Sequence, residues 1–188
     1  MHKKLSFRAM GLIIVVVLVF DQLTKYWIKT SMYLGQSYSV LGDFFRITYV
    51  ENPGMAFGVQ IENTYVFFGL SLVAAVLVFF YLYRLRNEGW VLQSALSLIA
   101  AGAIGNLVDR FIHGRVTDFL DVEFFDIHIP AFQILGVYFP GYSMTRWPVF
   151  NVADSAVTVG MIVLIAYLLF VGDPLKHSQP SPADSSHE

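Results

Sequence analysis

The sequence predicts an all-α integral membrane protein of four transmembrane helices, with a small β-sheet and a loop or lid on the extracytoplasmic side. Only 14% of its residues are charged, against about 25% in average protein usage, so the bilayer is its expected solvent. Uncharged stretches of membrane-spanning length recur along the chain, and one segment between them alternates in character as a strand does.

Four apolar stretches account for the predicted spans. A transmembrane helix needs about 20 mostly apolar residues, and residues 65–83, 91–108 and 155–172 provide such stretches. Residues 9–20 form a shorter run before Asp21, which the following QLTKYWI can extend toward an interface. Basic residues ahead of this run would also suit a secretory signal peptide, but DQLTKYWIKT offers no small-residue cleavage site. We therefore predict an uncleaved first span.

Orientation and domain organisation follow from the spans. Lysines and arginines divide evenly between the two sides of the membrane, so the positive-inside rule does not decide by count. The basic cluster Lys3, Lys4 and Arg8 beside the first span favours a cytoplasmic N-terminus, and four spans then return the C-terminus to the cytoplasm. Residues 1–172 are predicted to form one integral-membrane domain, and the polar, proline-bearing residues 173–188 a disordered tail.

The segment of residues 31–63 differs from the spans. Its FFRITYVE stretch alternates like a strand. The NPG that follows suits a turn, because Pro53 presets the second turn position and Gly54 tolerates a positive φ at the third. A small sheet on the outer membrane surface is the prediction.

Polar side chains gather near the predicted outer ends of the first, third and fourth spans, and one more lies in a short loop after the third. They are Asp21, Lys25, Asn106, Asp109, Arg110, Asn151 and Asp154, with Asp118 in the loop. Ionisable groups at membrane depth are costly, and they usually face a bundle interior or a wet cavity. One polar pocket built from three helices and a loop would account for all of them.

Structural roles remain open for the same residues. Asp21 and Lys25, four apart on one helix face, would also form an interfacial ion pair. Asp109 and Arg110 would also form a pair at a helix end. The glycines and alanines of AAGAIG, at residues 100–105, favour close helix packing.

The start of the fourth span has its own structural alternative. Asn151 is a good helix cap, and a carboxylate such as Asp154 is favoured near a helix N-terminus by the helix dipole.

Several classes of chemistry are excluded or disfavoured. The chain has no cysteine, which excludes a thiol nucleophile and a thiolate metal site, and its net charge of -2 gives no case for nucleic acid. His113 and His128 are single histidines without a second ligand at metal spacing, so no metal is predicted. Paired carboxylates remain as the main catalytic option. Asp118 and Asp154 would suit it if they meet, because one could hold a proton while the other takes one from water.

Five motifs carry a family resemblance. DQLTKYWI, ENPGMAFG, GAIGNLVDR, GRVTDFLDV and FNVADSAVTVG occur in this order, each at a fitting place relative to four spans. Together they closely resemble the lipoprotein signal peptidase (signal peptidase II) family over about residues 10 to 172. The resemblance implies a bacterial inner-membrane aspartic endopeptidase that removes the signal peptide of diacylglyceryl-modified prolipoproteins, cleaving just before the lipidated cysteine.

The resemblance also implies roles for single residues. Asp118 and Asp154 match the family's catalytic pair. Positions that line the substrate pocket match Asn52, Asn106, Asp109, Arg110 and Asn151. Supporting roles are expected of Asp21 and Gly54. The segment of residues 36–60 matches the small extracytoplasmic sheet, often described as a cradle. No cofactor is implied, the active site is expected near the extracytoplasmic face, and one chain in membrane lipids holds every motif, so a monomer is expected.

One departure concerns residues 119–149, which are more numerous than the resemblance leads us to expect and are rich in aromatic residues. Aromatic residues suit a membrane interface, so this segment is predicted to fold as a longer lid over the pocket. Whether Asp121, Asp126 or His128 joins the site stays open.

Two other classes of function compete. A small transporter or channel subunit would use the same carboxylates as a proton relay, although the chain shows no inverted repeat. A non-catalytic membrane adaptor would hold them only as structural pairs.

Overall fold

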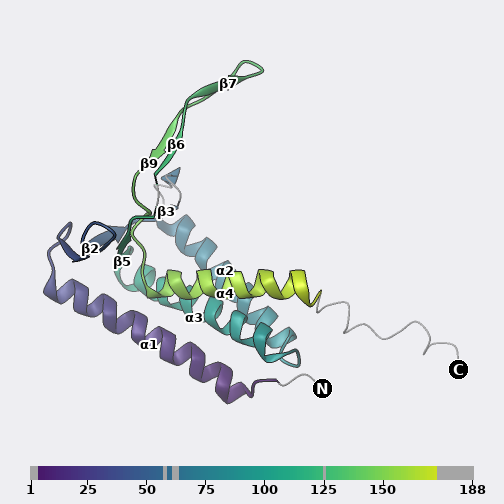
Figure 1. Cartoon of the computed structure of the whole chain (residues 1–188). Helices are drawn as coiled ribbons and strands as arrows, with labels where there is room; N and C mark the ends of the chain where they lie inside the picture. The colour runs from purple at the N-terminus through teal and green to yellow at the C-terminus, as the bar shows by residue number, and fades with distance from the viewer. Residues whose placement is uncertain (1–3, 57–58, 61–63, 125, 173–188) are drawn as a thin grey trace, which may run out of the picture.

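Four long helices form a bundle in the computed structural model, which describes residues 4–56, 59–60, 64–124 and 126–172. They are α1 (Phe7–Ser31), α2 (Thr64–Arg84), α3 (Trp90–His113) and α4 (Val152–Phe170). Helix α3 lies in the centre and packs against the other three (Figure 1). The predicted tail, residues 173–188, lies outside the described residues.

Three of these helices, α1, α3 and α4, are long and apolar enough to cross a membrane, judged over the described residues. At 1.5 Å per residue they are about 28–38 Å long, which matches a hydrocarbon core of about 30 Å. In α2 the apolar stretch found is Phe68–Arg84, which is shorter. The fourth predicted span therefore stays a prediction.

Glycines bring α3 and α4 into backbone contact. A Cβ atom added at Gly102 would lie 2.2 Å from the carbonyl oxygen of Ala153, and one at Gly160 would lie 2.7 Å from that of Ala95. No side chain fits such gaps. The prediction that AAGAIG serves close helix packing is confirmed, and the contact at Gly102 places the start of α4 beside the C-terminal half of α3.

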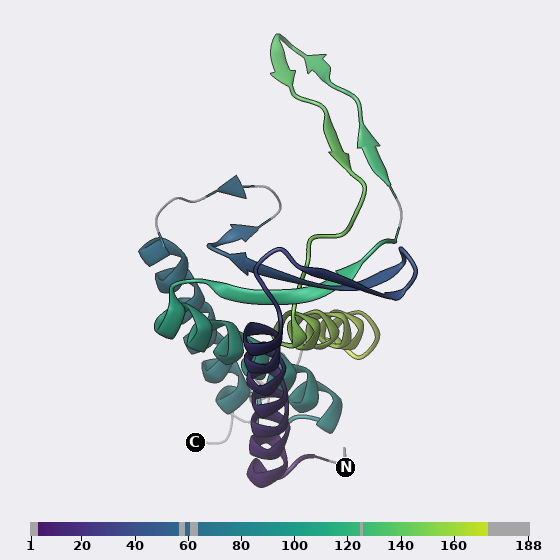
Figure 2. The same cartoon turned by 90° about the vertical axis from the view of Figure 1, so that its left-hand side faces the viewer.

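A three-stranded antiparallel sheet lies across one end of the bundle (Figure 2). Its order is β1 (Ser37–Leu41), β2 (Phe45–Asn52) and β5 (Val116–Val122). The predicted strand FFRITYVE is confirmed as β2, and Gly54 after it has the expected positive φ of 122°. Two short strands follow, β3 (Met55–Ala56) and β4 (Val59–Gln60).

The expectation that Asp118 lies in a short loop is wrong. This residue lies in the middle of β5, opposite Val50 of β2. The reason is visible in VTDFLDV, where β-branched and aromatic residues favour a strand and the open edge of β2 supplies a partner. Apolar side chains of α1 and the sheet, Ile28, Met32, Tyr49 and Phe119, bury the junction between them.

The segment predicted as a lid forms a long two-stranded hairpin instead. Its strands are β6 (Ile127–Ile129), β7 (Phe132–Ile134), β8 (Val137–Phe139) and β9 (Tyr142–Met144), with β6 paired to β9 and β7 to β8. It leaves the bundle on the side of the sheet and projects sideways, away from the helices (Figures 1 and 2). Only its root lies near the start of α4.

Candidate active site

Asn151 and Asp154 open helix α4 by exchanging two hydrogen bonds. The backbone N–H of Asp154 donates to Asn151 Oδ1 at 2.9 Å, and the backbone N–H of Asn151 donates to Asp154 Oδ2 at 3.2 Å. This is a capping box, which satisfies two N–H groups that a helix start leaves free. The prediction that Asn151 caps the helix is confirmed.

The same asparagine links two carboxylates that are far apart in the sequence. Its Nδ2 donates to Asp118 Oδ1 at 2.7 Å and to Asn106 Oδ1 at 3.0 Å. Asn106 Nδ2 in turn donates to Asp154 Oδ1 at 2.7 Å. A chain of two side-chain amides therefore runs from Asp118 on β5, through α3, to Asp154 on α4. A neutral amide holds each carboxyl group in place without neutralising it.

A cavity of about 520 Å³ opens onto these carboxyl groups. Asn52, Asp118 and Asp154 line its polar end, and α4 continues its wall through Ser155, Thr158 and Val159. Residues at the root of the hairpin and just after it complete the lining, namely Phe124, Trp147, Pro148, Val149 and Phe150. The cavity thus has a polar end with two acidic groups and an apolar wall that comes mainly from Phe124 and residues 147–150.

Burial and a neighbouring charge raise the pKa of Asp118. Removal from water raises the pKa of the Asp118 carboxyl, and the negative charge of Asp154 raises it further, to about 7. Hydrogen bonds from Asn52 and Asn151 act in the opposite direction on this pKa, because they favour the ionised form. A carboxylic acid that keeps its proton near neutral pH, beside a second carboxyl group, has the properties of a general acid–base pair.

A second polar cluster lies behind the first and is closed to solvent. Lys25 is 2% exposed, and its Nζ lies 2.9 Å from Asp21 Oδ2 and 3.2 Å from Asp109 Oδ2. It also donates to Asn106 Oδ1 at 3.1 Å. The predicted ion pair of Asp21 and Lys25 is present, but it is buried rather than interfacial.

The two aspartates of this cluster also hold backbone groups. Asp21 Oδ1 accepts from the N–H of Ala153, and Asp109 Oδ2 accepts from the N–H of Thr117. Ala153 precedes Asp154 and Thr117 precedes Asp118. The cluster therefore fixes the backbone on which both cavity carboxyl groups stand. Asp109 pairs with Lys25 in this way, whereas the sequence left a pair with Arg110 open.

Arg110 interacts with carboxyl groups of both polar clusters. Its Nη1 donates to the carbonyl oxygen of Asn106 at 3.4 Å, and its charge interacts with the carboxyl groups of Asp154 and Asp118. Arg110 and Asp109 are not among the residues that line the cavity, and their expected contact with substrate stays a prediction. Asn52 belongs to the lining, and it positions the turn after β2 by accepting from the N–H of Gly54 at 2.9 Å.

The chain matches the family described as signal peptidase (SPase) II over residues 13–170. It belongs to the signal peptidase II family. Curated relatives carry the name lipoprotein signal peptidase. The one from Moorella thermoacetica is 37% identical over 84% of this chain and 91% of its own length. The one from Staphylococcus aureus is 36% identical over 90% of this chain and 93% of its own length.

Solved structures agree with the family assignment. One bacterial membrane enzyme superposes with a TM-score of 0.72 at 34% identity, covering 96% of this chain and 99% of that one. A second has a TM-score of 0.70 at 35% identity, covering 90% of this chain and 98% of that one. The bundle and the sheet at its end are thus similar in arrangement to known bacterial membrane enzymes.

Lys25 is the residue of these polar clusters for which the sequence predicts no role beyond an ion pair with Asp21. The sequence shows a lysine four residues after an aspartate on one helix face, but it does not show that this lysine contacts Asp109 and Asn106 on another helix.

The residues that the sequence leaves open as further members of the site lie outside both polar clusters. Asp121 accepts from Thr48 Oγ1 at 2.6 Å and from Arg146 Nε at 2.8 Å, and His128 is exposed on the hairpin.

Proposed function

We propose that this chain is an intramembrane aspartic endopeptidase that removes the signal peptide from diacylglyceryl-modified prolipoproteins, cutting just before the lipidated cysteine. The observation that carries the proposal is the pair Asp118 and Asp154, joined by two asparagine amides at one end of a cavity. Membership of the signal peptidase II family supports the reaction and the substrate class.

The mechanism needs one proton shared by the pair. Below a pH of about 7 the proton resides on Asp118, because the pKa of this carboxyl is raised by burial and by Asp154. Asp154 takes a proton from water as the water attacks the scissile carbonyl carbon, and Asp118 gives its proton to the carbonyl oxygen. When the tetrahedral intermediate collapses, Asp154 protonates the leaving amine and Asp118 recovers its proton. The pair ends as it began.

Asparagine side chains position the substrate in this proposal. Asn52 stands in the cavity wall next to Asp118 and carries both a donor and an acceptor, which suits an extended peptide backbone. Asn106 and Asn151 hold the carboxyl groups in line, and Arg110 adds a positive charge that interacts with both of them. The diacylglyceryl chains of the substrate remain against the apolar wall formed by Phe124 and residues 147–150.

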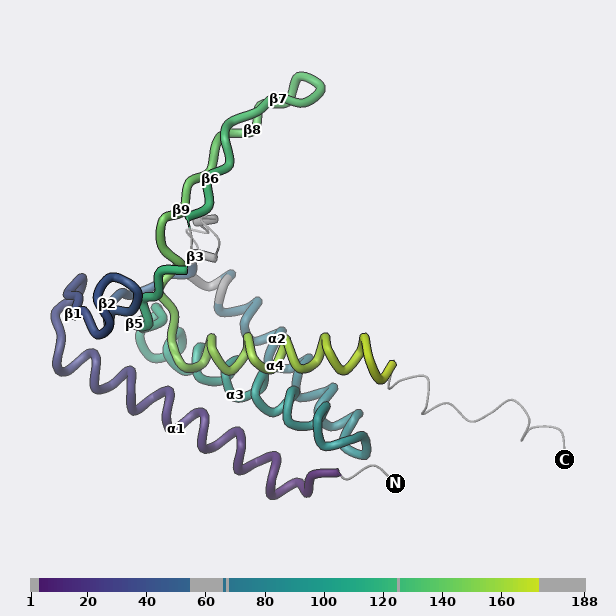
Figure 3. Tube along the Cα trace, in the orientation of Figure 1, coloured from purple at the N-terminus to yellow at the C-terminus, as the bar shows by residue number. Residues whose placement is uncertain are grey.

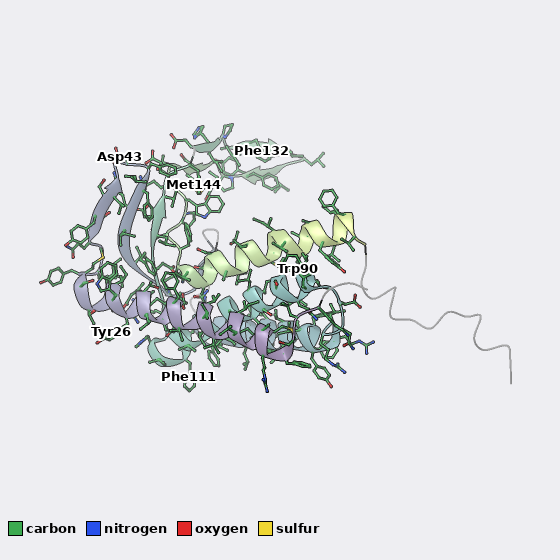
Figure 4. The ribbon with its side chains drawn as sticks, turned by 60° about the horizontal axis from the view of Figure 1, so that its bottom comes forward. Tyr26, Asp43, Trp90, Phe111, Phe132 and Met144 are labelled. Carbon is green, nitrogen blue, oxygen red and sulfur yellow. The ribbon has the colours of Figure 1, made fainter. Side chains whose placement is uncertain are left out.

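The membrane placement completes the proposal. We assign α2 as a fourth span, with both termini in the cytoplasm of a bacterial cell and the cavity near the extracytoplasmic face of the inner membrane. Aromatic residues exposed at the two ends of the bundle support this placement, since Tyr and Trp favour membrane interfaces. Tyr26 lies toward the sheet and Trp90 at the opposite end (Figure 4). One chain carries every proposed site residue, so a monomer is sufficient.

Cleavage of a defined substrate tests the reaction. Purified protein in detergent is incubated with a diacylglyceryl-modified prolipoprotein, and mass spectrometry should show release of the whole signal peptide. An unlipidated prolipoprotein serves as the control substrate and should stay intact. Equal cleavage of both substrates, or of neither, would contradict the proposed substrate class.

Reporter fusions test the placement. A reporter fused after residue 120 should report an extracytoplasmic location, and one fused after residue 87 a cytoplasmic location. The reverse pattern would place the cavity on the cytoplasmic side. A cytoplasmic location at both positions would contradict the assignment of α3 as a span between them.

A further inference from the structure

The β6–β9 hairpin exposes apolar side chains along its length. Leu135 at its tip is 99% exposed, and Ile134, Val137 and Tyr138 are each more than half exposed. An isolated two-stranded hairpin is marginally stable in water. Contiguous exposed apolar surface in such an element marks a surface that contacts a membrane or another molecule.

The distal half of the hairpin has two different faces. Phe132 pairs with Phe139, and Ile134 pairs with Val137, so these four side chains share one face of β7 and β8. The rings of Phe132 and Phe139 stack with centroids 5.0 Å apart. The opposite face carries Gln133 and Tyr138. One face is thus wholly apolar, and the other bears groups that can hydrogen-bond to water.

Charge is missing where a water-facing hairpin would need it. From residue 127 to residue 145 the sequence contains no Asp, Glu, Lys or Arg. Exposed strand edges in soluble proteins are usually protected by charged side chains, because a bare edge pairs with other chains. An uncharged, aromatic-rich hairpin instead has the composition of a segment that lies at a membrane interface.

The hairpin also runs in the right direction for such a surface. It starts at the end of the bundle where the sheet lies, and it runs across the direction of the helices rather than continuing it (Figure 3). Met144 lies near the sheet, and Phe132 far out along the hairpin (Figure 4). If the helices span a bilayer, the hairpin therefore extends along the bilayer surface.

Arg146 fixes this direction at the root. It donates to Asp121 Oδ1 at 2.8 Å and to the carbonyl oxygen of Asp43 at 3.0 Å, and it forms an ion pair with Glu123. The returning strand is thereby tied to both β5 and the β1–β2 turn. The hairpin does not hang from a free loop but leaves the sheet at a set position.

We infer that the hairpin is an interfacial membrane anchor, whose distal apolar face (Phe132, Ile134, Val137 and Phe139) and tip (Leu135) insert into the outer leaflet of the bilayer. This inference rests on the proposed membrane placement. The free edges of the hairpin keep unpaired backbone groups, which cannot enter the hydrocarbon core, so the insertion reaches only the interfacial region.

The root of the hairpin connects this anchor to the cavity. Phe124 and Trp147 line the cavity, and their rings meet edge to face at 6.2 Å. The anchor holds the cavity entrance at the level of the outer-leaflet lipids, where a diacylglyceryl-modified substrate resides.

The absence of cysteine from the sequence makes a clean test possible. Single-cysteine variants L135C, at the tip, and Q133C, on the polar face of the same strand, are labelled with an environment-sensitive fluorophore and reconstituted in phospholipid vesicles. The L135C label should be quenched by lipids that carry a shallow spin label and protected from aqueous iodide. The Q133C label should be the more iodide-sensitive of the two by about threefold or more.

Two outcomes would overturn the inference. Equal iodide quenching of both labels would place the hairpin in water. Protection from iodide without quenching by spin-labelled lipid would mean that protein, a second copy or a partner, covers the tip. These readouts do not depend on catalysis, so they separate a failure of the anchor from a failure of the proposed peptidase.

A charged variant provides the second arm. Ile134→Asp combined with Val137→Asp, in the L135C background, should return the label to iodide access in vesicles. The activity of this variant in detergent should stay within about twofold of the parent, which shows that the fold and the cavity are intact. A label that stays buried in lipid despite two added charges would contradict insertion through this face.

Discussion

Asp21 and Asp109 share a buried lysine, whereas Asp118 and Asp154 share a chain of two asparagine amides. The two groups lie side by side at the same end of the bundle and even touch, because Lys25 donates to the amide oxygen of Asn106. All four carboxyl groups are largely withdrawn from water. They differ in what compensates for their burial.

From this difference we infer a structural role for the lysine cluster and a catalytic role for the amide-linked pair. A lysine between two carboxylates neutralises charge, and once buried such a group is costly to break. Amides hold carboxyl groups by hydrogen bonds but add no charge, so one member of the pair keeps a proton instead. The cavity opens onto the amide-linked pair and not onto the lysine cluster. We expect substitutions in the amide-linked pair to affect mainly activity, and substitutions in the lysine cluster to affect mainly stability.

The largest expected effect is on the reaction. Asp118→Asn or Asp154→Asn keeps the size of the side chain but removes its ability to exchange a proton, so the cleavage rate should fall by about 10²–10⁴-fold or more. The melting temperature in detergent should change little. Asp43→Asn, at an exposed turn of the sheet, is the matched control and should cleave at the parent rate. Substantial turnover by either cavity variant would contradict the assignment of the pair.

The lysine cluster should show the opposite pattern. Lys25→Met leaves Asp21 and Asp109 without their cation, and removing one partner of a buried ion pair typically costs about 3–5 kcal/mol. Lys29→Met, one turn later on α1 and partly exposed, is the control, with an expected change of at most about 0.5 kcal/mol. Thermal or denaturant unfolding in detergent measures the free energy of unfolding of both variants. If Lys25→Met kept its stability and lost only activity, the division between the two groups would not hold.

Asn151 both caps α4 and donates a hydrogen bond to Asp118, so its substitution can separate an effect on stability from an effect on activity. Asn151→Ser retains a good capping oxygen but loses the Nδ2 donor that reaches Asp118 and Asn106. The melting temperature should therefore stay close to that of the parent. The cleavage rate should fall about tenfold, corresponding to about 1.5 kcal/mol for one good hydrogen bond. An unchanged rate together with an unchanged melting temperature would reduce Asn151 to a helix cap.

The sequence is informative where the physics is local. Long apolar runs, the alternation of FFRITYVE and the glycine after Asn52 each follow from neighbouring residues, and the structure bears them out in α1, α3, α4, β2 and the φ of Gly54. The cap at Asn151 is local in the same way. The run of small residues around Gly102 also indicates close helix packing, because small side chains allow helices to approach.

Contacts between distant segments escape the sequence. Lys25 of α1 forms an ion pair with Asp109 of α3. No local sequence pattern predicts which of several carboxylates a buried lysine will contact. The composition of VTDFLDV favours a strand, but the strand that holds Asp118 forms only because β2 supplies a paired edge, and that pairing depends on tertiary context. The aromatic segment after β5 forms a hairpin rather than a lid, and this outcome is set by register and by the root at Arg146.

The smallest expected effect is a pH dependence that belongs to the amide-linked pair. The pKa of Asp118 is raised to about 7 by burial and by the charge of Asp154. The catalytic form carries one proton on the pair, so kcat/KM should lose about half of its value near pH 7 and keep falling as pH rises. A rate that increased steadily to pH 9 would mean that the active pair carries no proton.

The pH dependence of protein stability should report the same proton on Asp118. Because the pKa of Asp118 is higher in the folded protein than in an unfolded chain, the fold binds this proton more tightly. The stabilisation is full below the pKa of an unfolded aspartate, about 4. It is lost as pH rises from there through about 7, because the unfolded chain has given up a proton that the fold still binds until its own carboxyl ionises. Asp118→Asn has no such proton, so its melting temperature should decline less than that of the parent between about pH 5 and about pH 8. Melting curves of both proteins across this range provide the measurement, and Asp43→Asn should follow the parent. If Asp118→Asn left the decline of melting temperature with pH unchanged, Asp118 would be ionised over this whole pH range. The proton of the pair would then have to reside on Asp154.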